Sequence, residues 1–337
     1  MKQRVTIADV AKVAGVSKQT VSRAINNKGE ISPETKERIM SVIAELGYRP
    51  NRMAQAMTTQ QSLMVGLLIP DITNPFFAEV ARGVQDAALD HDYNVLLCNT
   101  DGNQATEMRL LDLLTEQSSD AFIMWSVQTD LKTLAQFTEG GRPILVINQH
   151  VRAPGISEFM VDNSHGAQLA VEHFVASGRQ HIAMLTNVGI PLDEVRRVQG
   201  FRDAVRRLDR QQEPEAIVKA HATLEGGREG THRLFATMPH TDAIFTYNDL
   251  MALGAIRACH ELGKRIPEDI SIIGFDDIQF AAMSSPALST VHVDKYALGQ
   301  QAFLRTLQLL QEPNHTLPAV EFDISLKLRE TTLPRIS

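Results

Sequence analysis

Apolar residues recur with two different spacings along this chain, and the change of spacing separates a head from a longer body. Within residues 1–50 they return every three or four positions, as at Ile7, Val10, Ala11 and Ala14, which would share one face of a helix. From residue 62 onward, short continuous apolar runs alternate with longer amphipathic stretches. The first pattern is typical of helices alone, and the second of strands and helices in turn.

The head begins with two short helices joined by a tight turn. Thr6 followed by Asp9 is the pattern of a capping box, which starts the first helix. Gly15 ends that helix because glycine adopts the left-handed conformation at no steric cost, and Ser17 caps a second helix that turns Val21 inward. This arrangement is typical of a helix-turn-helix, whose second helix lies in the major groove of DNA. The alternative is an ordinary helical hairpin at the N-terminus of an enzyme.

A third helix is expected to complete the head. Ser32 and Pro33 are favoured at the start of a helix, and Gly47 is favoured just past its end. The apolar residues that would close a small core with the first two helices are Ile39, Val42, Ile43 and Leu46. Polar residues 58–62 then form a linker to the body.

The body contains two successive series of strands and helices. Strands are expected at residues 64–69, 95–98, 121–125 and 144–147, and then at 182–185, 217–219, 243–246 and 271–274. Helices are expected at residues 77–89, 108–117, 166–177, 198–208, 250–262 and 297–311. The alternation predicts two α/β subdomains with parallel sheets and a ligand cleft at the carboxyl ends of the strands. Residues 290–293 and 320–328 would return to complete the two sheets, so that the chain crosses between the subdomains several times.

The charge is distributed unevenly between head and body. The chain of 337 residues carries a net charge of −7, yet residues 1–60 hold ten Lys and Arg against five Asp and Glu. The head is therefore +5 and the remainder −12. A basic head suits contacts with DNA phosphates, and an acidic body suits repulsion of DNA elsewhere.

Composition indicates a soluble protein of the reducing cytoplasm. Apolar residues make up 43% and charged residues 22% of the chain, as in globular proteins. Two cysteines, Cys98 and Cys259, imply no disulfide framework. The N-terminus has no apolar signal segment, and the longest apolar run, residues 63–70, is too short to span a bilayer.

The sequence carries no signature of an enzyme, a cofactor site or a metal site. The motifs G-x-S-x-G and H-E-x-x-H, the phosphate-binding P-loop and G-x-G-x-x-G are all absent. The glycine cluster at residues 226–230 lacks the spacing of a phosphate loop and is expected to be a turn entering a helix. The eleven histidines form no metal-ligand pattern.

Five motifs, in order and at the expected spacing, identify a family resemblance. They are residues 6–23, residues 47–51 (Gly-Tyr-Arg-Pro-Asn), residues 71–77 (Asp-Ile-Thr-Asn-Pro-Phe-Phe), residues 248–252 (Asn-Asp-Leu-Met-Ala) and residues 274–277 (Gly-Phe-Asp-Asp). Together they resemble the lactose-repressor-like (LacI/GalR) family of bacterial transcription regulators, over essentially the whole chain. The resemblance implies a homodimer that binds a pseudopalindromic operator, with an affinity that a small effector switches.

The resemblance also implies a domain organisation and a fold class. An all-α helix-turn-helix DNA-binding domain would span residues 1–50, and a hinge helix with its linker would span residues 51–61. Residues 62–337 would form an α/β, periplasmic-binding-protein-like body of two Rossmann-like subdomains for effector binding and dimerisation. The N-subdomain would take about 62–162 and 291–322, and the C-subdomain about 163–290 and 323–337.

The exposed start of the second helix is the predicted DNA-reading surface. Lys18 and Gln19 stand where the family places its base-reading pair, since Lys can donate to guanine and Gln can pair with adenine. Arg23 lies one turn further on, and the short polar side chains nearby suit phosphate contacts. The alternative for Lys18 is a solvated charge. The predicted DNA-binding residues of the head are Thr6, Ser17, Lys18, Gln19, Thr20, Ser22, Arg23 and Asn26.

Residues 51–57 resemble the family's hinge helix, which enters the minor groove. Its expected DNA contacts are Asn51, Met53, Ala54 and Met57. Met57 stands where relatives usually have leucine, an apolar wedge that kinks DNA. Gln55 stands where many relatives have arginine, so one charge contact is expected to be missing. The alternative for Met57 is a linker residue that packs on the body.

The resemblance places effector-binding residues at strand ends in the body. They are Phe76, Asp101, Ser126, Asp162, Arg197, Asn248 and Asp276. Phe77 is expected either there or in the core, Asp162 has helix capping as its alternative, and Asp277 is expected to cap a helix. Pro191 replaces an arginine found in purine-responsive relatives, which disfavours a purine. We therefore expect a monosaccharide, a sugar acid or a related polyol.

Three other functions remain open from the sequence. A solute-binding protein could share the two-lobed body, but the basic head and the missing signal segment oppose it. An enzyme could use Asp71, Asp276 and Asp277 as cleft carboxylates. A regulator of the same family could answer to a protein partner. After Leu333 the chain shows no leucine heptads of the kind that make tetramers, which favours a dimer.

Overall fold

The computed structural model describes residues 5–25, 29, 31–48, 61–125, 127–151, 153–188, 191–208, 216–312, 317 and 321–335. The chain forms two compact units, residues 1–62 and 63–337. The first unit is the head and the second is the body. The expected hinge helix at residues 51–57 lies outside the described residues.

The head is a three-helix unit, as the apolar spacing predicts. Its helices are α1 (Ile7–Ala14), α2 (Lys18–Ile25) and α3 (Pro33–Leu46). The Asp9 carboxylate accepts hydrogen bonds from the Thr6 N–H at 2.9 Å and the Thr6 hydroxyl at 2.7 Å, and Gly15 ends α1 at φ 65°. The Ser17 hydroxyl accepts from the Thr20 N–H at 3.0 Å at the start of α2. The buried core of the head consists of Val10, Ala11, Ala14, Val21, Ala24, Ile39 and Val42.

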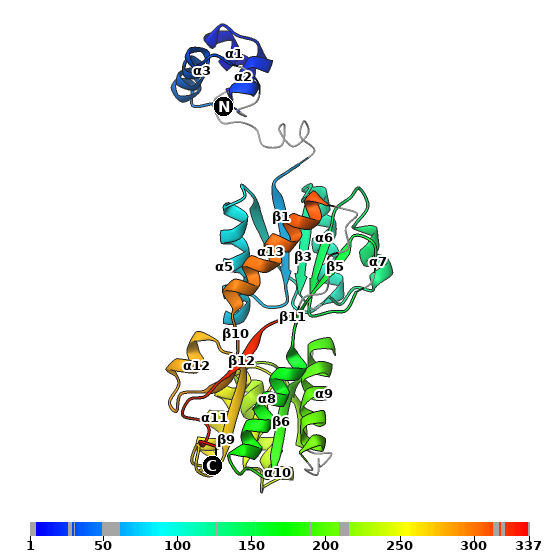
Figure 1. Ribbon diagram of the computed structural model, residues 1–337, viewed down its shortest axis with the longest axis vertical. Helices are drawn as coiled ribbons and strands as arrows, with labels where there is room; N and C mark the ends of the chain where they lie inside the picture. Colours follow the sequence, from blue (N-terminus) through cyan, green and yellow to red (C-terminus); the bar gives the residue numbers. More distant parts are fainter. Residues whose placement is uncertain are drawn as a thin grey trace. The chain divides into compact units, whose positions relative to one another are not determined.

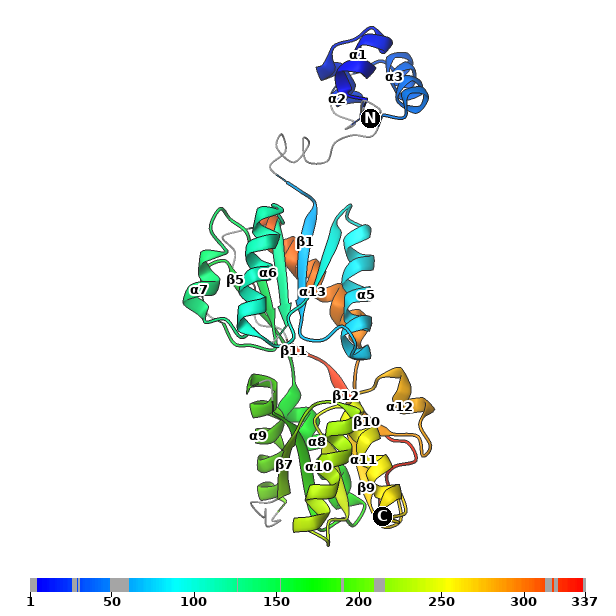
Figure 2. The same ribbon diagram turned by 180° about the vertical axis from the view of Figure 1, so that it is seen from behind.

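The first sheet of the body has the strand order β11-β5-β4-β3-β1-β2, and all its strands are parallel. Its strands are β1 (Met64–Ile69), β2 (Asn94–Asn99), β3 (Ala121–Trp125), β4 (Ile144–Ile147), β5 (Ile156–Val161) and β11 (Glu321–Phe322). The helices on it are α5 (Pro75–Leu89), α6 (Gln104–Glu116), α7 (Leu131–Gln136) and α13 (Lys295–Gln311). Figure 1 and Figure 2 show α5 and α13 side by side on one face and α6 on the other.

The second sheet has the strand order β12-β10-β9-β8-β6-β7, in which only β12 is antiparallel to its neighbour among the described strands. Its strands are β6 (Ile182–Asn187), β7 (Ile217–Ala220), β8 (Ala243–Thr246), β9 (Ser271–Asp276), β10 (Ser289–Val293) and β12 (Ile324–Lys327). Its helices are α8 (Asn163–Ala176), α9 (Pro191–Arg207), α10 (Leu224–Thr237), α11 (Asp249–Glu261) and α12 (Gln279–Met283).

The chain crosses between the two sheets at three described points. The first crossing follows Val161 at the end of β5, the second follows Val293 at the end of β10, and the third separates β11 from β12. Because β10 pairs with β9, the second crossing falls slightly later than the boundary expected at residue 291. The segment expected at 320–328 is divided between the two sheets.

The glycine cluster of residues 226–230 lies inside α10, so its expected role as a turn entering a helix is wrong. A Cβ on Gly227 would lie 2.1 Å from the carbonyl oxygen of Met251 on α11. A Cβ on Gly254 of α11 would in turn lie 2.0 Å from the carbonyl oxygen of Leu224. Both distances are far below any real contact, so α10 and α11 pack backbone against backbone and need glycine at these positions.

Candidate functional site

A cleft that is open to solvent lies at the carboxyl ends of strands from both sheets of the body. Strand ends are where ligands bind in open parallel sheets. The residues that line the cleft are Pro70, Asp71, Asn74, Phe76, Phe77, Trp125, Arg197, Ala222, Tyr247, Asn248 and Asp276.

One wall of the cleft is aromatic. The rings of Phe76, Phe77 and Trp125 contact one another edge to face, with centroids 5.1–5.3 Å apart. Asn74 caps α5 by accepting a hydrogen bond from the Phe76 N–H at 3.0 Å, which fixes the start of the helix at this wall. Phe77 both belongs to the hydrophobic core and lines the cleft, so both roles expected for it are filled. Such a wall suits the apolar face of a sugar ring.

Arg197 is held rigidly on the opposite side of the cleft. Its side chain is only 7% exposed, and its guanidinium lies 3.6 Å from the Phe275 ring centroid and 4.5 Å from that of Tyr247. Its Nε donates to Asn163 Oδ1 at 2.8 Å, and its Nη1 donates to the Tyr247 carbonyl oxygen. Its Nη2 lies 3.8 Å from Asp276 Oδ1, so the two charges form a buried ion pair. These contacts fix the guanidinium before any ligand arrives.

Asn248 and Asp276 reach the cleft from the ends of β8 and β9. Asn248 caps α11, since its Oδ1 accepts from the Met251 N–H at 2.9 Å, and its amide also donates to the Ala222 carbonyl at 3.2 Å. Asp276 has the unusual φ of 111° and is 5% exposed. Their polar groups therefore sit at fixed positions beside Arg197.

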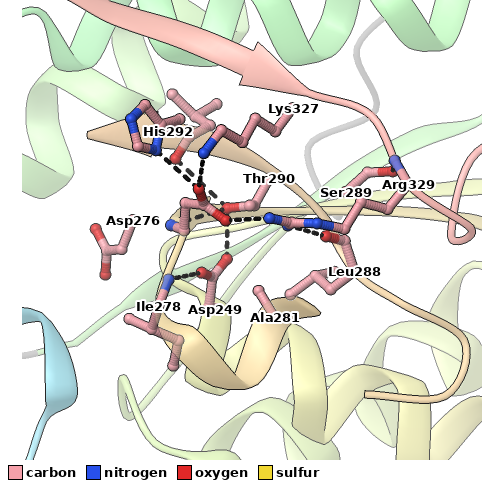
Figure 3. A network of polar contacts seen from close by, with 12 residues as sticks. Asp249, Asp276, Ile278, Ala281, Leu288, Ser289, Thr290, His292, Lys327 and Arg329 are labelled. Carbon is pink, nitrogen blue, oxygen red and sulfur yellow. Dashed lines mark hydrogen bonds and ion pairs between the residues drawn. The ribbon is translucent and has the colours of Figure 1, made fainter. Parts of the chain in front are cut away.

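Asp277 is not among the residues that line the cleft, and it does not cap a helix, so the capping role expected for it is wrong. Its carboxylate accepts hydrogen bonds from His292 Nδ1 and Lys327 Nζ, both at 2.8 Å, and from Arg329 Nη2 at 2.5 Å. Figure 3 labels these three basic residues. Burial acts to raise the pKa of Asp277, but hydrogen bonds from these three residues outweigh it and lower the pKa to about 2. Asp277 thereby ties the end of β9 to β10 and to the segment around β12.

Asp249, and not Asp277, binds the backbone at the start of α12. It is fully buried, and its carboxylate accepts from the Ile278 N–H at 2.8 Å and from the Thr290 hydroxyl at 2.6 Å (Figure 3). Burial, together with the nearby Asp276 carboxylate, raises the pKa of Asp249 well above its usual value. Asp249 directly follows Asn248 and binds the backbone just after Asp276. It therefore fixes the positions of these two cleft residues relative to each other.

Acid is expected to weaken the body through Asp277. Its pKa is lower in the folded chain than the usual 3.8, so its contribution to stability is complete above about pH 4 and is lost as pH falls toward about 2. The contribution is on the order of 2 kcal/mol. We expect Asp277→Asn to lower the urea midpoint at pH 7. When the pH is lowered from 4 to 3, the urea midpoint of the variant should fall less than that of the wild type.

The matched control for this experiment is Asp112→Asn, on the exposed surface of α6. It should follow the wild type at every pH. An Asp277→Asn midpoint that runs parallel to the wild type throughout acid titration would show that the three basic partners contribute nothing to stability.

Two of the other expected effector residues, Asp101 and Asp162, are not among the residues that line the cleft. Asp101 is exposed and accepts a hydrogen bond from Asn99 Nδ2 at 2.5 Å. Asp162 caps α8 by accepting from the His165 N–H at 2.9 Å, which is the alternative considered for it. Ser126 lies outside the described residues. The cleft instead adds Asp71, Asn74, Trp125 and Tyr247, all of which stand at strand ends or helix starts.

The head presents a polar face on α2. Lys18, Gln19 and Arg23 are exposed, whereas Val21 and Ala24 on the opposite side of the helix are buried. Ser17, Thr20 and Thr6 take part in hydrogen bonds at the starts of α2 and α1, and Ser22 is half-buried. The remaining expected DNA contacts lie outside the described residues: Asn26, Asn51, Met53, Ala54 and Met57.

The part of the chain that the structure describes holds no group of three or more His, Cys, Asp or Glu side chains that could bind a metal ion. Arg197 and Asp276 in the cleft are instead paired with each other. This arrangement can bind a polar molecule through several hydrogen bonds at once.

Comparison with known proteins gives matches to both units. Residues 6–51 match the family described as bacterial regulatory proteins of the lacI family, and residues 62–324 match the periplasmic binding proteins and sugar binding domain of the LacI family. A ribose operon repressor from Halalkalibacterium halodurans is 37% identical over 329 residues, which cover 97% of each chain.

Two solved structures resemble the chain closely. The Lac repressor dimer bound to operator and the anti-inducer ONPF has a TM-score of 0.87 and 29% identity, over 98% of this chain and 100% of that one. A LacI family regulator from Enterococcus faecium with bound ribose has a TM-score of 0.74 and 28% identity, over 80% of this chain and 99% of that one.

Proposed function

The chain belongs to the LacI family of bacterial regulatory proteins, and from this premise we propose that it is a transcription repressor whose operator affinity is switched by a neutral monosaccharide. The observation that carries the proposal is the cleft with its aromatic wall on one side and the Arg197–Asp276 pair on the other. The basic head binds DNA, and the cleft senses the sugar. The family consists of transcription regulators, so the cleft binds its ligand without converting it.

The charges of the cleft favour a neutral sugar over a sugar acid. Among its lining residues, Asp71 and Asp276 are acidic and Arg197 is basic. Because Asp276 already neutralises Arg197, a ligand carboxylate would face an excess of negative charge. Hydroxyl groups can instead donate to the carboxylates and accept from the guanidinium N–H groups. Ribose is the first sugar to test, since it is named for the similar repressor and bound in the similar regulator.

The proposed DNA-reading residues are the exposed side chains of α2. Lys18 and Gln19 select bases in the major groove, and Arg23 contacts a base or a nearby phosphate. The hinge residues Asn51, Met53, Ala54 and Met57 are proposed to bend the operator at its centre. A solute-binding protein would share the cleft but would have no use for this head.

We propose that the chain acts as a homodimer in the cytoplasm on a pseudopalindromic site. Large apolar side chains are exposed on the body, among them Phe280 at 50% and Met283 at 70% on α12. Exposed apolar side chains of this size are favoured at contacts between subunits. Every helix within the described ranges is too short or too polar to cross a bilayer.

A thermal-shift comparison of matched ligands tests the proposed effector class. A ligand that binds only the folded chain stabilises it by about 2.7 kcal/mol at a concentration 100 times its Kd, which is measured as a higher melting temperature. We expect ribose or another neutral aldose to raise the melting temperature of the body, and the matching aldonic acid to leave it unchanged. Ribose recovered unaltered after incubation would support binding without turnover.

The result that would contradict the proposal is stabilisation by the aldonic acid alone. Conversion of the sugar by the purified protein would instead support an enzyme. Guanine serves as a control ligand, because a planar, uncharged base lacks the hydroxyl groups that this cleft can use.

A further inference from the structure

Lys295 is a buried lysine that does not line the cleft but binds the backbone at the end of β9, one of the strands that reach the cleft. It is the first residue of α13 and only 4% exposed. Its ammonium donates to the carbonyl oxygens of Asp276 at 2.9 Å, Asp277 at 2.7 Å and Val293 at 3.3 Å. An ammonium has three protons, and three carbonyls accept them. A lysine is rarely buried so completely unless its charge has a specific use.

The turn that Lys295 holds is conformationally unfavourable. Asp276 has φ 111° and Asp277 has φ 54°, and two successive residues with positive φ are unusual outside glycine. The strain persists because surrounding groups bind the backbone of the turn. Lys295 binds its carbonyls, the Thr290 hydroxyl accepts from the Asp277 N–H at 3.3 Å, and Asp249 accepts from the Ile278 N–H. The direction of the Asp276 carboxylate into the cleft therefore depends on these groups.

Lys295 is also part of the opposite subdomain. It begins α13, which lies on the first sheet, whereas the turn it grips ends β9 of the second sheet. Glu79 on α5 places a carboxylate oxygen 3.7 Å from its ammonium. Lys295 thus joins, through one charged group, the turn beside the ligand and two helices of the other subdomain.

The helices α5 and α13 behave mechanically as one body, because their backbones touch. A Cβ on Gly83 of α5 would lie 2.1 Å from the Tyr296 carbonyl, and a Cβ on Gly299 of α13 would lie 2.1 Å from the Val80 carbonyl. Helices packed this closely cannot slide past each other without losing these contacts. A displacement at the start of α13 is therefore shared by α5, whose own start, at Asn74 and Phe76, lines the cleft.

We propose that Lys295 couples ligand occupancy at Asp276 to the α5–α13 helix pair, and so carries the sugar signal from the second subdomain to the first. The inference rests on the proposed function, because it names the path by which that sugar would act. A bound ligand that shifts the Asp276 turn shifts the ammonium with it. The ammonium in turn moves the helix pair, so that the two subdomains change their arrangement together.

Replacement of Lys295 by methionine tests the coupling, because it removes the ammonium and keeps most of the length of the unbranched side chain. Ribose affinity is measured from the fluorescence of Trp125, the single tryptophan of the chain, which lines the cleft. Affinity for a duplex selected in vitro with the wild-type chain is measured without ribose and at saturating ribose. The ratio of these two DNA affinities is the coupling factor, which for allosteric proteins is about 5–150-fold.

We expect Lys295→Met to reduce the coupling factor at saturating ribose about tenfold or to unity, while DNA affinity without ribose changes less than about threefold. Glu79→Gln, which leaves the carbonyl contacts in place, should reduce it to a smaller extent. The matched control is Lys132→Met at the exposed start of α7, which should keep the wild-type factor. A merely structural lysine would lower the melting temperature and leave the saturated ratio unchanged.

A wild-type coupling factor in Lys295→Met overturns the inference, whatever happens to ribose affinity. If circular dichroism shows that Lys295→Met does not fold, the coupling factor of Glu79→Gln is the deciding measurement. A wild-type coupling factor in Glu79→Gln then overturns the inference. Failure of the proposed function looks different, since the wild-type chain itself would then show no response of DNA binding to ribose.

Discussion

Replacing Arg197 with alanine is expected to abolish sugar binding while the chain still binds operator DNA. The guanidinium is fixed by Asn163, Tyr247 and Phe275 before the ligand arrives, so little entropy is lost when it binds hydroxyl groups. Each charge-assisted hydrogen bond contributes about 1.5–3 kcal/mol, so the loss of two should weaken ribose binding by roughly a hundredfold or more. Titration of Trp125 fluorescence gives the affinity for ribose, and a mobility-shift assay gives the affinity for DNA.

The substitution also removes structural contacts, which a control must separate from ligand binding. Alanine would remove the buried ion pair between Arg197 and Asp276, so the melting temperature should fall. Arg202→Ala lies on the same helix but is exposed, and it should change neither the sugar affinity nor the melting temperature. Unaltered ribose binding by a folded Arg197→Ala protein would contradict the proposed site. Loss of DNA binding in the folded variant would show that Arg197 mainly supports the active arrangement of the body.

The sequence predicts most of the body because nearly all of its strands are parallel and most of them are buried on both faces. Such strands have sequences that are continuous apolar runs. The expected bounds are the same as the observed ones for four strands, β1, β3, β4 and β8. The strand β5 escapes prediction because Ser157 and Glu158 interrupt its apolar run. Glu158 accepts a hydrogen bond from the Val151 N–H at 2.9 Å, a contact that spacing alone does not reveal. Short α7 and α12 are missed because neither offers enough turns to display a helical period.

The residues in and around the cleft also divide into those that the sequence predicts and those that it does not. Phe76, Asn248 and Asp276 lie within the family motifs, the family resemblance also places Arg197 at the site, and all four line the cleft. No local sequence pattern marks the residues whose hydrogen bonds fix these four side chains in position. Asp249 receives its hydrogen bonds from Ile278 and Thr290, which are far away in the sequence. They meet Asp249 because α11 packs against β9 and because β9 pairs with β10. The same holds for Lys295, whose contacts exist because the chain crosses between the subdomains just before it.

Replacing Lys18 or Gln19 with alanine is expected to relax sequence recognition at particular base pairs. Both side chains are exposed at the start of α2, so a base edge can approach them. A good bidentate contact discriminates against the wrong base by about 1–3 kcal/mol, so each variant should lose roughly 5- to 150-fold in affinity for the preferred duplex. In vitro selection with each variant, compared with the wild type, should show degeneracy at one position in each half-site and an unchanged remainder.

The outcome distinguishes base reading from phosphate contact because the two respond differently to sequence and to salt. A lysine that touches only phosphate weakens all duplexes alike and lowers the slope of log K against log salt by about 0.9. Lys36→Ala on the exposed surface of α3 provides the matched loss of one charge, and its selected sequence should equal that of the wild type. If Lys18→Ala behaves as Lys36→Ala does, Lys18 is not a base reader. Gln19 carries no charge, so any weakening in Gln19→Ala comes without a change in salt slope, and degeneracy at one base pair would then identify its contact directly.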